Sequence, residues 1–242
     1  MTKTIVVSAF FHIPSKQPYS FYRQHLLRWF RSIQCQVIFF TSTDVHDDII
    51  SFGFDLKHIK FVIMSCNDFN AWKLGTEFWQ RQKERDVETY HTPEVAAIWF
   101  EKKEFVKRAF ALCDADVFIW CDAGCVRNDA SETALKYFGT RNTNINDGCI
   151  HVQHIRSQEY KKYYVYPDSR FAAAIIAGNR YAWEKLYSLY NVVLKEYDDN
   201  GISCNSDQYI LATCYDKKPD MFVTHSPQNN DIDMWFFFLN LL

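Results

Sequence analysis

Hydrophobic residues along the chain gather in short runs that alternate with amphipathic stretches. The runs at 4–11, 36–42 and 59–65 are short and rich in β-branched and aromatic residues, which is the pattern of buried strands. Between the first two, residues 19–33 place apolar side chains three or four positions apart, with basic residues between them, as in a helix. This alternation predicts an α/β fold with a mixed, mainly parallel sheet flanked by helices.

The same pattern continues through the second half of the chain. A helix is predicted over 92–113, where Thr92 is a suitable N-cap and Pro93 suits the first helical position. Further strands are predicted at 117–121, within 148–154, at 170–178 and at the start of 221–230, and further helices at 130–138, 179–201 and 205–215. Residues 67–90 and most of 139–170 carry no clear period. No repeat or linker divides the 242 residues, so a single domain is expected.

Composition narrows the functional classes. The formal net charge is -2, and no basic stripe of the kind that binds nucleic acid is evident. No leader-like segment and no run of about 20 apolar residues is present, so we expect a cytoplasmic protein without a transmembrane segment. The apolar segment 235–242 is expected to pack on the domain rather than on a membrane. Aromatic residues make up 17%, enough for a ring-rich core and for stacking on sugars or bases.

One carboxylate follows a predicted strand directly. The strand at 117–121 ends in Asp122, Ala123 and Gly124. Ligands of open α/β sheets gather at the carboxyl ends of strands, so Asp122 is either a ligand-binding residue or a turn former. Asp114 and Asp116 precede the strand and are expected at the opposite edge. Lys102 interrupts the apolar stripe of the helix before it, and either extends to solvent or points at an anionic group.

The order of these motifs resembles the GT-A class of nucleotide-sugar glycosyltransferases, and most closely the HtrL/YibB-like family of putative glycosyltransferases. The resemblance spans most of the chain. The matching stretches are TIVVSAFF (4–11), TPEVAAIWFEKKEFV (92–106), VFIWCDAGCVRND (117–129), IIAGNRYAWEKLYSLY (175–190) and SDQYIL (206–211). Each motif alone is weak, but their shared order is more specific.

The resemblance implies a single GT-A-like, Rossmann-like domain over 1–242, with a nucleotide-binding N-terminal half and an acceptor-binding C-terminal half. It implies a glycosyltransferase that moves a sugar from a nucleoside-diphosphate sugar to a hydroxyl of a glycan or glycoprotein. A divalent cation, Mn²⁺ or Mg²⁺, would neutralise the leaving diphosphate. Asp122 matches the first aspartate of the Asp-x-Asp motif of such enzymes, and His225 matches a late histidine ligand. Gly124 stands where the wider class has the second aspartate.

Further site residues follow from the same resemblance. Asp207 and Gln208 match a pair that faces the transferred sugar, which makes them the candidate catalytic residues. On the sequence alone Asp207 is also a helix-dipole partner worth about 0.3–1 kcal/mol. Lys102 and Arg127 are candidate diphosphate contacts, although Arg127 also reads as a solvated loop arginine and His225 as a loop histidine. The remaining candidates are Ser8, Ala9 and Phe10 for the nucleotide, Ala123 and Gly124 beside Asp122, and Ala177 and Gly178 for the substrate.

Two other functions stay open at this point. A sugar nucleotidyltransferase on a related fold is expected to carry a glycine-rich phosphate loop after the first strand, and residues 8–16, SAFFHIPSK, contain no glycine. A non-catalytic nucleotide- or glycan-binding protein on a decayed transferase fold is the other alternative, and the glycine at position 124 is compatible with it.

Overall fold

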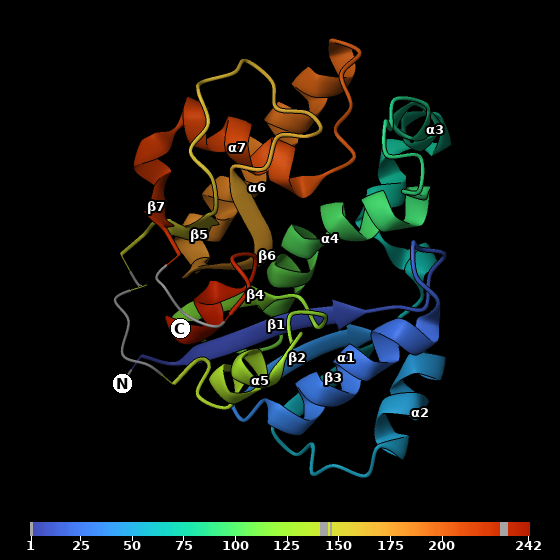
Figure 1. Ribbon diagram of the computed structural model, residues 1–242, viewed down its shortest axis with the longest axis vertical. Coiled ribbons are helices and arrows are strands. Elements are labelled where there is room, and N and C mark those ends of the chain that lie inside the picture. Colours follow the sequence, from blue (N-terminus) through green and yellow to red (C-terminus); the bar gives the residue numbers. More distant parts are fainter. Residues whose placement is uncertain (1, 141–144, 146, 228–231) are drawn as a thin grey trace.

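A mixed sheet forms the centre of the protein in the computed structural model, which describes residues 2–140, 145, 147–227 and 232–242 (Figure 1). Within these residues the sheet has seven strands in the order β3-β2-β1-β4-β6-β5-β7. The strands are β1 (Thr4–Phe10), β2 (Val37–Thr41), β3 (Ile59–Ile63), β4 (Val117–Cys121), β5 (Ile150–His154), β6 (Phe171–Asn179) and β7 (Phe222–His225).

Most neighbouring strands are parallel, as the sequence predicts. β1 runs parallel to both β2 and β4, β2 to β3, and β5 to β7. β6 is the exception, because it runs antiparallel to β4 on one side and to β5 on the other. The carboxyl end of β6 therefore lies at the opposite edge of the sheet from the carboxyl ends of β1 and β4.

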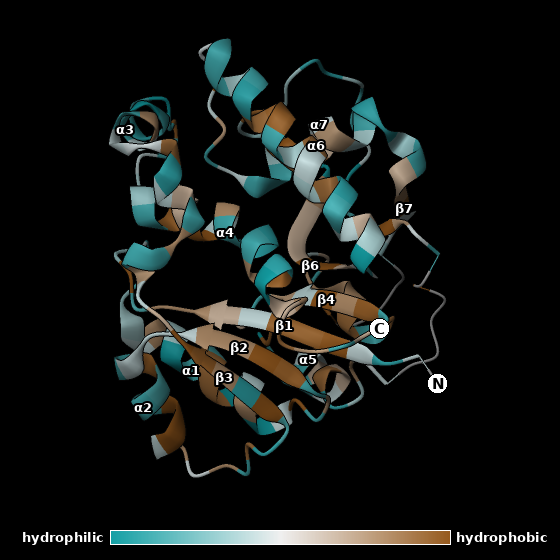
Figure 2. Cartoon of the chain, turned by 180° about the vertical axis from the view of Figure 1, so that it is seen from behind, coloured by the Kyte–Doolittle hydropathy of each residue, from teal (hydrophilic) through white to brown (hydrophobic). Residues whose placement is uncertain are grey.

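Helices cover both faces of this sheet. α1 (Tyr19–Ser32), α2 (Thr43–Ser51), α5 (Asp129–Leu135) and the 3₁₀ turn η4 (Phe237–Asn240) contribute to one core, and α3 (Thr76–Glu84), α4 (Pro93–Ala109), α6 (Arg180–Asp199) and α7 (Asp207–Lys217) to the other. The strands are largely hydrophobic, whereas the outer helices mix hydrophilic and hydrophobic residues (Figure 2). Along β1, Ile5 and Val7 enter one core and Val6 enters the other, as the alternation of a strand requires.

The structure also assigns elements that the hydrophobic pattern left open. Residues 67–90 form most of η1 (Cys66–Asp68), together with η2 (Asn70–Leu74) and α3. Helix α2 was not predicted from the sequence. A further 3₁₀ turn, η3, spans Pro219–Met221. Part of the uncertain stretch 139–170 lies outside the described residues. In the apolar end of the chain, Phe237, Phe238 and Leu239 are buried, which confirms that this segment packs on the domain. No helix of the described ranges is long and apolar enough to cross a membrane.

Helix α4 occupies an unusually enclosed position. Its N-terminus forms as predicted, since Thr92 Oγ1 accepts a hydrogen bond from Val95 N and Pro93 takes the first position. The helix packs against β1, β4, α3, η2 and α6. Because it has neighbours on several sides, the charged run Glu101–Glu104 in its middle is buried. One of these charged residues, Lys102, lines the cavity described below.

Candidate active site

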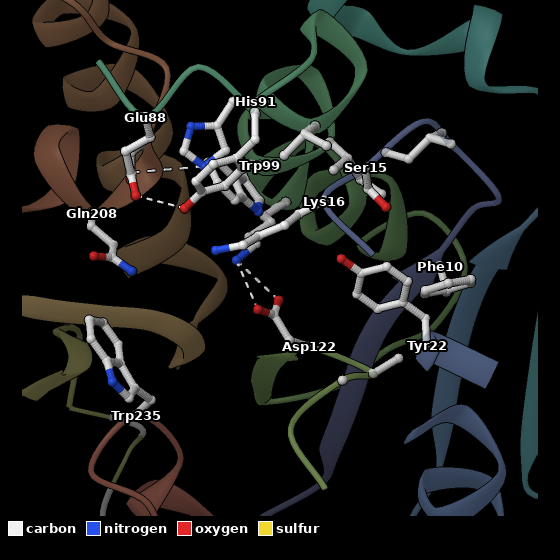
Figure 3. Close-up of a pocket in the computed structure, with 18 of the residues that line it drawn as sticks. Phe10, Ser15, Lys16, Tyr22, Glu88, His91, Trp99, Asp122, Gln208 and Trp235 are labelled. Carbon is white, nitrogen blue, oxygen red and sulfur yellow. Dashed lines mark hydrogen bonds and ion pairs between the residues drawn. The ribbon is translucent and has the colours of Figure 1, made fainter. Parts of the chain in front are cut away.

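A cavity of about 610 Å³ opens at the carboxyl edge of β1 and β4 (Figure 3). The chain leaves β1 toward β2 on one side and later returns to β4 on the other. This reversal is the topological switch point at which open α/β sheets bind their ligands. The cavity is lined by residues after β1, from α4, from the turn after β4, from the loop 166–169, from the start of α7 and from residues 235–236. Its volume falls within the range of roughly 300–1,000 Å³ typical of small-molecule sites.

The Lys102 ammonium group lies at the inner wall of this cavity, surrounded by oxygen atoms. Lys102 Nζ is 3.0 Å from Asp122 Oδ1, 2.8 Å from Asp207 Oδ2 and 3.0 Å from the carbonyl oxygen of Ala173. Four separate elements supply these groups: α4, the turn after β4, the start of α7 and the first half of β6. Of the two alternatives for Lys102, the structure therefore favours a lysine that points at anionic groups.

Burial and charge act in opposite directions on this cluster. Burial alone lowers the pKa of Lys102, but the neighbouring Asp122 and Asp207 carboxylates reverse this effect, so the pKa is raised overall. Burial raises the pKa of Asp207, and the Lys102 ammonium opposes that rise. The side chain of Asp207 is only 8% exposed, and that of Asp122 is 31% exposed. Asp122 is thus the carboxylate of this pair that faces the cavity.

Asp122 forms the turn and also faces the cavity. Its backbone N–H donates to Ala174 O, and its carbonyl oxygen accepts from Cys125 N, which closes a turn after β4. Its side chain accepts a hydrogen bond of 2.7 Å from Trp120 Nε1 and points into the cavity (Figure 3). The backbone at Gly124 lies outside the left-handed region, and a Cβ atom there would meet only Arg127 Nη2, at 3.7 Å.

The structure gathers most of the predicted residues around the cavity and sets others apart. Among the predicted residues, Ala9, Phe10, Lys102, Asp122, Ala123, Gly124, Arg127 and Gln208 line it, and Asp207 lies behind Lys102. Ser8 does not line it, because its buried hydroxyl donates to Cys121 O at 2.6 Å and joins β1 to β4. Arg127 is solvent-exposed, with its guanidinium 5.5 Å from the ring centroid of Phe236.

Ala177 and Gly178 lie at the far edge of the sheet. Because β6 is antiparallel to β4, Ala177 pairs with Ile119 and Gly178 with Phe118, away from the carboxyl end of β4. A Cβ atom on Gly178 would lie 3.0 Å from Ile150 Cδ1, so the glycine there permits close packing of strand and helix. The first half of β6 reaches the site instead, through the carbonyl of Ala173.

His225 is likewise separated from Asp122. It ends β7, and β6 and β5 lie between β7 and β4, a separation of roughly 14 Å at about 4.8 Å per strand. Its Nε2 lies 3.0 Å from His151 Nδ1, its ring contacts Phe238, and burial lowers its pKa. Across the described ranges, no group of three His, Cys, Asp or Glu side chains is arranged to hold a metal ion. Among the described residues, Asp122 and His225 are therefore not brought together as the Mn²⁺ or Mg²⁺ site that the resemblance implies.

Several cavity residues were not anticipated from the sequence. On one side of Asp122 the close-up shows Glu88 and Trp235 beside the predicted Gln208, and on the other Tyr22 beside the predicted Phe10 (Figure 3). Lys16, from the loop after β1, places its ammonium 4.2 Å from the ring centroid of Tyr90. Lys16, Glu88 and Trp235 lie in loops, which carry no period, so the only signal for them was the aromatic and charged composition of those loops, whereas Tyr22 lies on the predicted helix α1.

Searches for similar proteins give a family but no activity. No curated protein matches the sequence significantly. Two solved structures resemble the fold distantly. One is a glycosyltransferase involved in the glycosylation of the major capsid of PBCV-1 (TM-score 0.42, 9% identity, covering 93% of this chain and 82% of that one). The other is 4-diphosphocytidyl-2C-methyl-D-erythritol synthase from Anaerococcus prevotii (TM-score 0.44, 11% identity, 99% and 97%). Neither likeness is close enough to assign a function.

The family assignment rests on the sequence and extends over nearly the whole chain. A family described as a bacterial protein of unknown function, HtrL_YibB, matches residues 3–239. The chain therefore belongs to the HtrL_YibB family.

Proposed function

We propose that the protein is a glycosyltransferase that uses a nucleoside-diphosphate sugar as donor and a hydroxyl of a glycan or glycoprotein as acceptor. The observation that carries this proposal is an aromatic-walled cavity at the β1/β4 switch point, with the Asp122 carboxylate at its centre and basic side chains around it. Such a cavity offers separate places for a base, a diphosphate and a sugar.

Basic groups suit the diphosphate. Arg127 and Lys16 are exposed at the cavity and come from different loops. Guanidinium groups bind phosphate oxygens in a bidentate manner, and ammonium groups bind them as point charges. When the bond between the sugar's anomeric carbon and the diphosphate oxygen breaks, these cations stabilise the charge that develops on the leaving diphosphate.

The other cavity groups suit a nucleoside and a sugar. Phe10 and Tyr22 offer rings near the end of β1, where a base stacks, in the N-terminal half of the chain. Across Asp122, the amide of Gln208 and the indole of Trp235 come from the C-terminal half and suit sugar hydroxyls and sugar faces (Figure 3). Asp122, between the two sides, accepts hydrogen bonds from ribose or sugar hydroxyls. No metal ion is part of this proposal.

A binding and turnover screen tests the assignment. Uridine, guanosine, adenosine and cytidine diphosphates are added to the protein separately, and its thermal unfolding is followed. The release of the nucleoside diphosphate from the matching nucleotide-sugar donors is then measured. Ligand at 100 times its Kd stabilises the native state by about 2.7 kcal/mol, so at least one nucleotide is expected to raise the Tm clearly. If none shifts the Tm at millimolar concentration, the proposal is wrong.

A matched pair of arginine variants locates the effect. Arg127→Ala removes a cavity arginine, and Arg180→Ala removes an exposed arginine at the opposite edge, 5.0 Å from the centroid of Phe110. Only Arg127→Ala is expected to weaken nucleotide binding. Pyrophosphate release from a nucleoside triphosphate and a sugar phosphate would instead identify a nucleotidyltransferase, and binding without turnover of any donor would identify a binding protein.

A further inference from the structure

The surroundings of Lys102 Nζ are those of a bound cation. Three oxygen atoms approach it within 3.0 Å, two from carboxylates and one from a backbone carbonyl, and four elements of the fold meet there. Carboxylate and carbonyl oxygens are also the ligands that divalent cations such as Mg²⁺ and Ca²⁺ prefer. The ammonium group thus occupies the place where the carboxylates of this site converge.

We infer that the Lys102 ammonium serves as the fixed cation of this site in place of a divalent metal ion, so that nucleotide binding is independent of metal. The identity of the ligand, a nucleotide, rests on the proposed function. The role of Lys102 as the cation rests on the geometry of the cluster. Lys102 Nζ donates hydrogen bonds to Asp122 Oδ2 at 3.2 Å and to Ala173 O at 3.0 Å, and it forms an ion pair with Asp207 Oδ2 at 2.8 Å. Both carboxylates are ion-paired with Lys102, so a metal ion would have to compete with the ammonium for them.

The charges around the cavity agree with this inference. The single positive charge of Lys102 offsets the negative charge of one of its two carboxylate partners, whereas the charge of a divalent ion would offset both. The additional positive charge comes from Lys16 and Arg127, which also line the cavity. Of the two other carboxylates of the lining, Asp168 pairs with Lys161 at 2.6 Å, whereas Glu88 accepts from the neutral Tyr90 Oη at 2.6 Å and keeps its charge. Lys102, Lys16 and Arg127 therefore balance Asp122, Asp207 and Glu88. Lys16 and Arg127, which pair with no carboxylate of the described cavity lining, are the cations left to face a diphosphate.

Metal binding without any nucleotide tests the cation assignment directly. Mn²⁺ is titrated into the wild-type protein and free Mn²⁺ is followed by electron paramagnetic resonance. We expect no saturable site below about 1 mM, a weak range for carboxylate-based cation sites. A tighter site that disappears in Asp122→Asn would overturn the inference, whether or not the protein proves to be a glycosyltransferase.

Nucleotide affinity then tests the role of the ammonium. The affinity for the nucleoside diphosphate found in the screen is measured by calorimetry in excess EDTA and in Mn²⁺, and the two values are expected to agree within a factor of about three, less than the energy of one hydrogen bond. Affinity that is tenfold or more tighter in Mn²⁺ would overturn the inference. If no nucleotide binds in either buffer and Mn²⁺ alone does not bind, the proposed function fails while the cation assignment stands.

Two variants complete the test. Lys102→Met leaves the buried Asp207 carboxylate unpaired and is expected to fold poorly. The double variant Lys102→Met/Asp207→Asn avoids this and keeps the net charge of the cluster at its wild-type value. In the folded double variant, nucleotide affinity should fall about tenfold or more, as for a lost charged contact. Lys103→Met removes a neighbouring buried lysine that pairs with Glu104 instead, and should bind nucleotide normally. Normal affinity in the double variant would contradict the role of Lys102.

Discussion

Among single residues, Asp207 shows how strongly burial changes the weight of a carboxylate. In the sequence it is a first-turn residue of a helix, and such residues commonly face solvent. In the structure it does begin α7, but its side chain is enclosed and lies 2.8 Å from Lys102 Nζ. Without Asp207, the buried Lys102 ammonium keeps Asp122 as its carboxylate partner but loses its closest contact, which costs more than the loss of a helix-dipole contact.

Replacement of Asp207 should therefore destabilise the fold. Asp207→Ala is expected to reduce the free energy of unfolding by about 1–3 kcal/mol, the usual cost when a buried donor loses one partner. Chemical denaturation followed by circular dichroism measures it. Asp129→Ala is the matched control. Asp129, like Asp207, is a first-turn aspartate with a basic partner, here Arg28, but its side chain is 96% exposed. Equal losses in the two variants would contradict the buried pair.

Gly124 allows the Asp-x-Asp motif to be rebuilt. Its backbone conformation is open to other residues, and a Cβ atom has ordinary contact distance to Arg127. We expect Gly124→Ala to fold and to bind nucleotide normally. Gly124→Asp should fold as well, but its carboxylate would pair with Arg127 and weaken nucleotide binding by about tenfold, the value of one charged hydrogen bond. Stronger, Mn²⁺-dependent binding in Gly124→Asp by calorimetry would favour a metal site instead.

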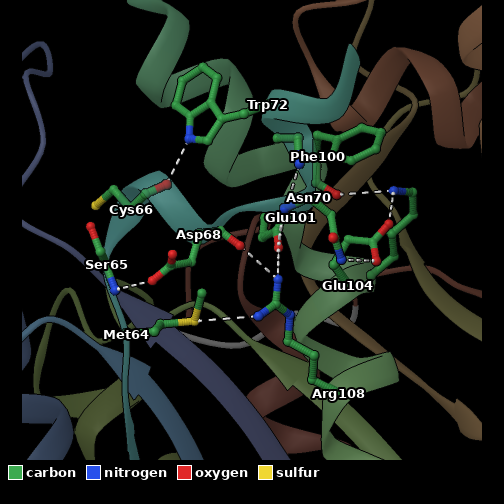
Figure 4. Close-up of polar contacts among 12 residues, drawn as sticks. Met64, Ser65, Cys66, Asp68, Asn70, Trp72, Phe100, Glu101, Glu104 and Arg108 are labelled. Atoms are coloured by element: carbon green, nitrogen blue, oxygen red, sulfur yellow. Dashed lines mark hydrogen bonds and ion pairs between the residues drawn. The ribbon is translucent and has the colours of Figure 1, made fainter. Parts of the chain in front are cut away.

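Among the elements, α4 connects the cavity to η2, the 3₁₀ turn before α3. Lys102 faces the cavity, whereas the preceding residue, Glu101, faces the segment before α3 (Figure 4). The side chain of Glu101 is fully buried and accepts hydrogen bonds of 3.0 Å from the backbone N–H groups of Asn70 and Ala71, and one of 3.1 Å from Arg108. Glu101 thereby fixes η2 against α4.

This anchor should make stability depend on pH. Burial raises the pKa of Glu101 to about 7, although the two N–H donors and Arg108 oppose the rise. Between its ordinary pKa of 4.5 and about 7 the native state keeps a proton that the unfolded chain has released. The Glu101 contribution is therefore complete below the ordinary pKa and is lost as pH rises through about 7.

The Glu101→Gln variant should lack this loss. Relative to the variant, the wild-type free energy of unfolding should fall by up to about 3 kcal/mol across that pH window, at 1.36 kcal/mol per pKa unit. Urea denaturation at several pH values measures the difference. Glu84→Gln, at an exposed position on α3, should follow the wild type. A difference between wild type and Glu101→Gln that does not change with pH would show that Glu101 is ionised throughout.

For the whole molecule, the main feature is that both halves of the chain build one cavity. Residues 9–16 and 122–127 contribute from one half, and 166–169, 206–209 and 235–236 from the other. The continuous sheet, in which β6 pairs directly with β4, holds these segments together. The nucleoside diphosphate part of a nucleotide sugar should therefore contact mainly the N-terminal half, and its sugar mainly the C-terminal half.

Hydrogen exchange should reveal this division. A nucleoside diphosphate is expected to slow exchange in 9–16 and 122–127, and the matching nucleotide sugar should add protection in 206–209 and 235–236. The reason is that bound groups order the segments that contact them and raise the free energy of local opening. Mass spectrometry of peptides from each state provides the measurement. Identical protection by both ligands would contradict the assignment of the C-terminal half to the sugar.

The sequence by itself determined the local structure and one edge of the site. The strand Val117–Cys121 matches its predicted range, α4 begins with its predicted cap, and Asp114 and Asp116 are exposed before β4. These features follow from side-chain period, capping and turn chemistry, which depend only on neighbouring residues. The position of Asp122 at the carboxyl end of its strand followed from the same rules.

Only the tertiary structure decided which distant residues meet. A strand that is buried on both faces reads the same in either direction, so the sequence of β6 did not show that it runs antiparallel and carries Ala177 and Gly178 away from the site. Strand order likewise separated His225 from Asp122. The sequence left open whether Lys102 extends to solvent or points at an anionic group, because its partners come from positions 20, 71 and 105 residues further along the chain. Such contacts arise from long-range packing, on which local patterns carry no information.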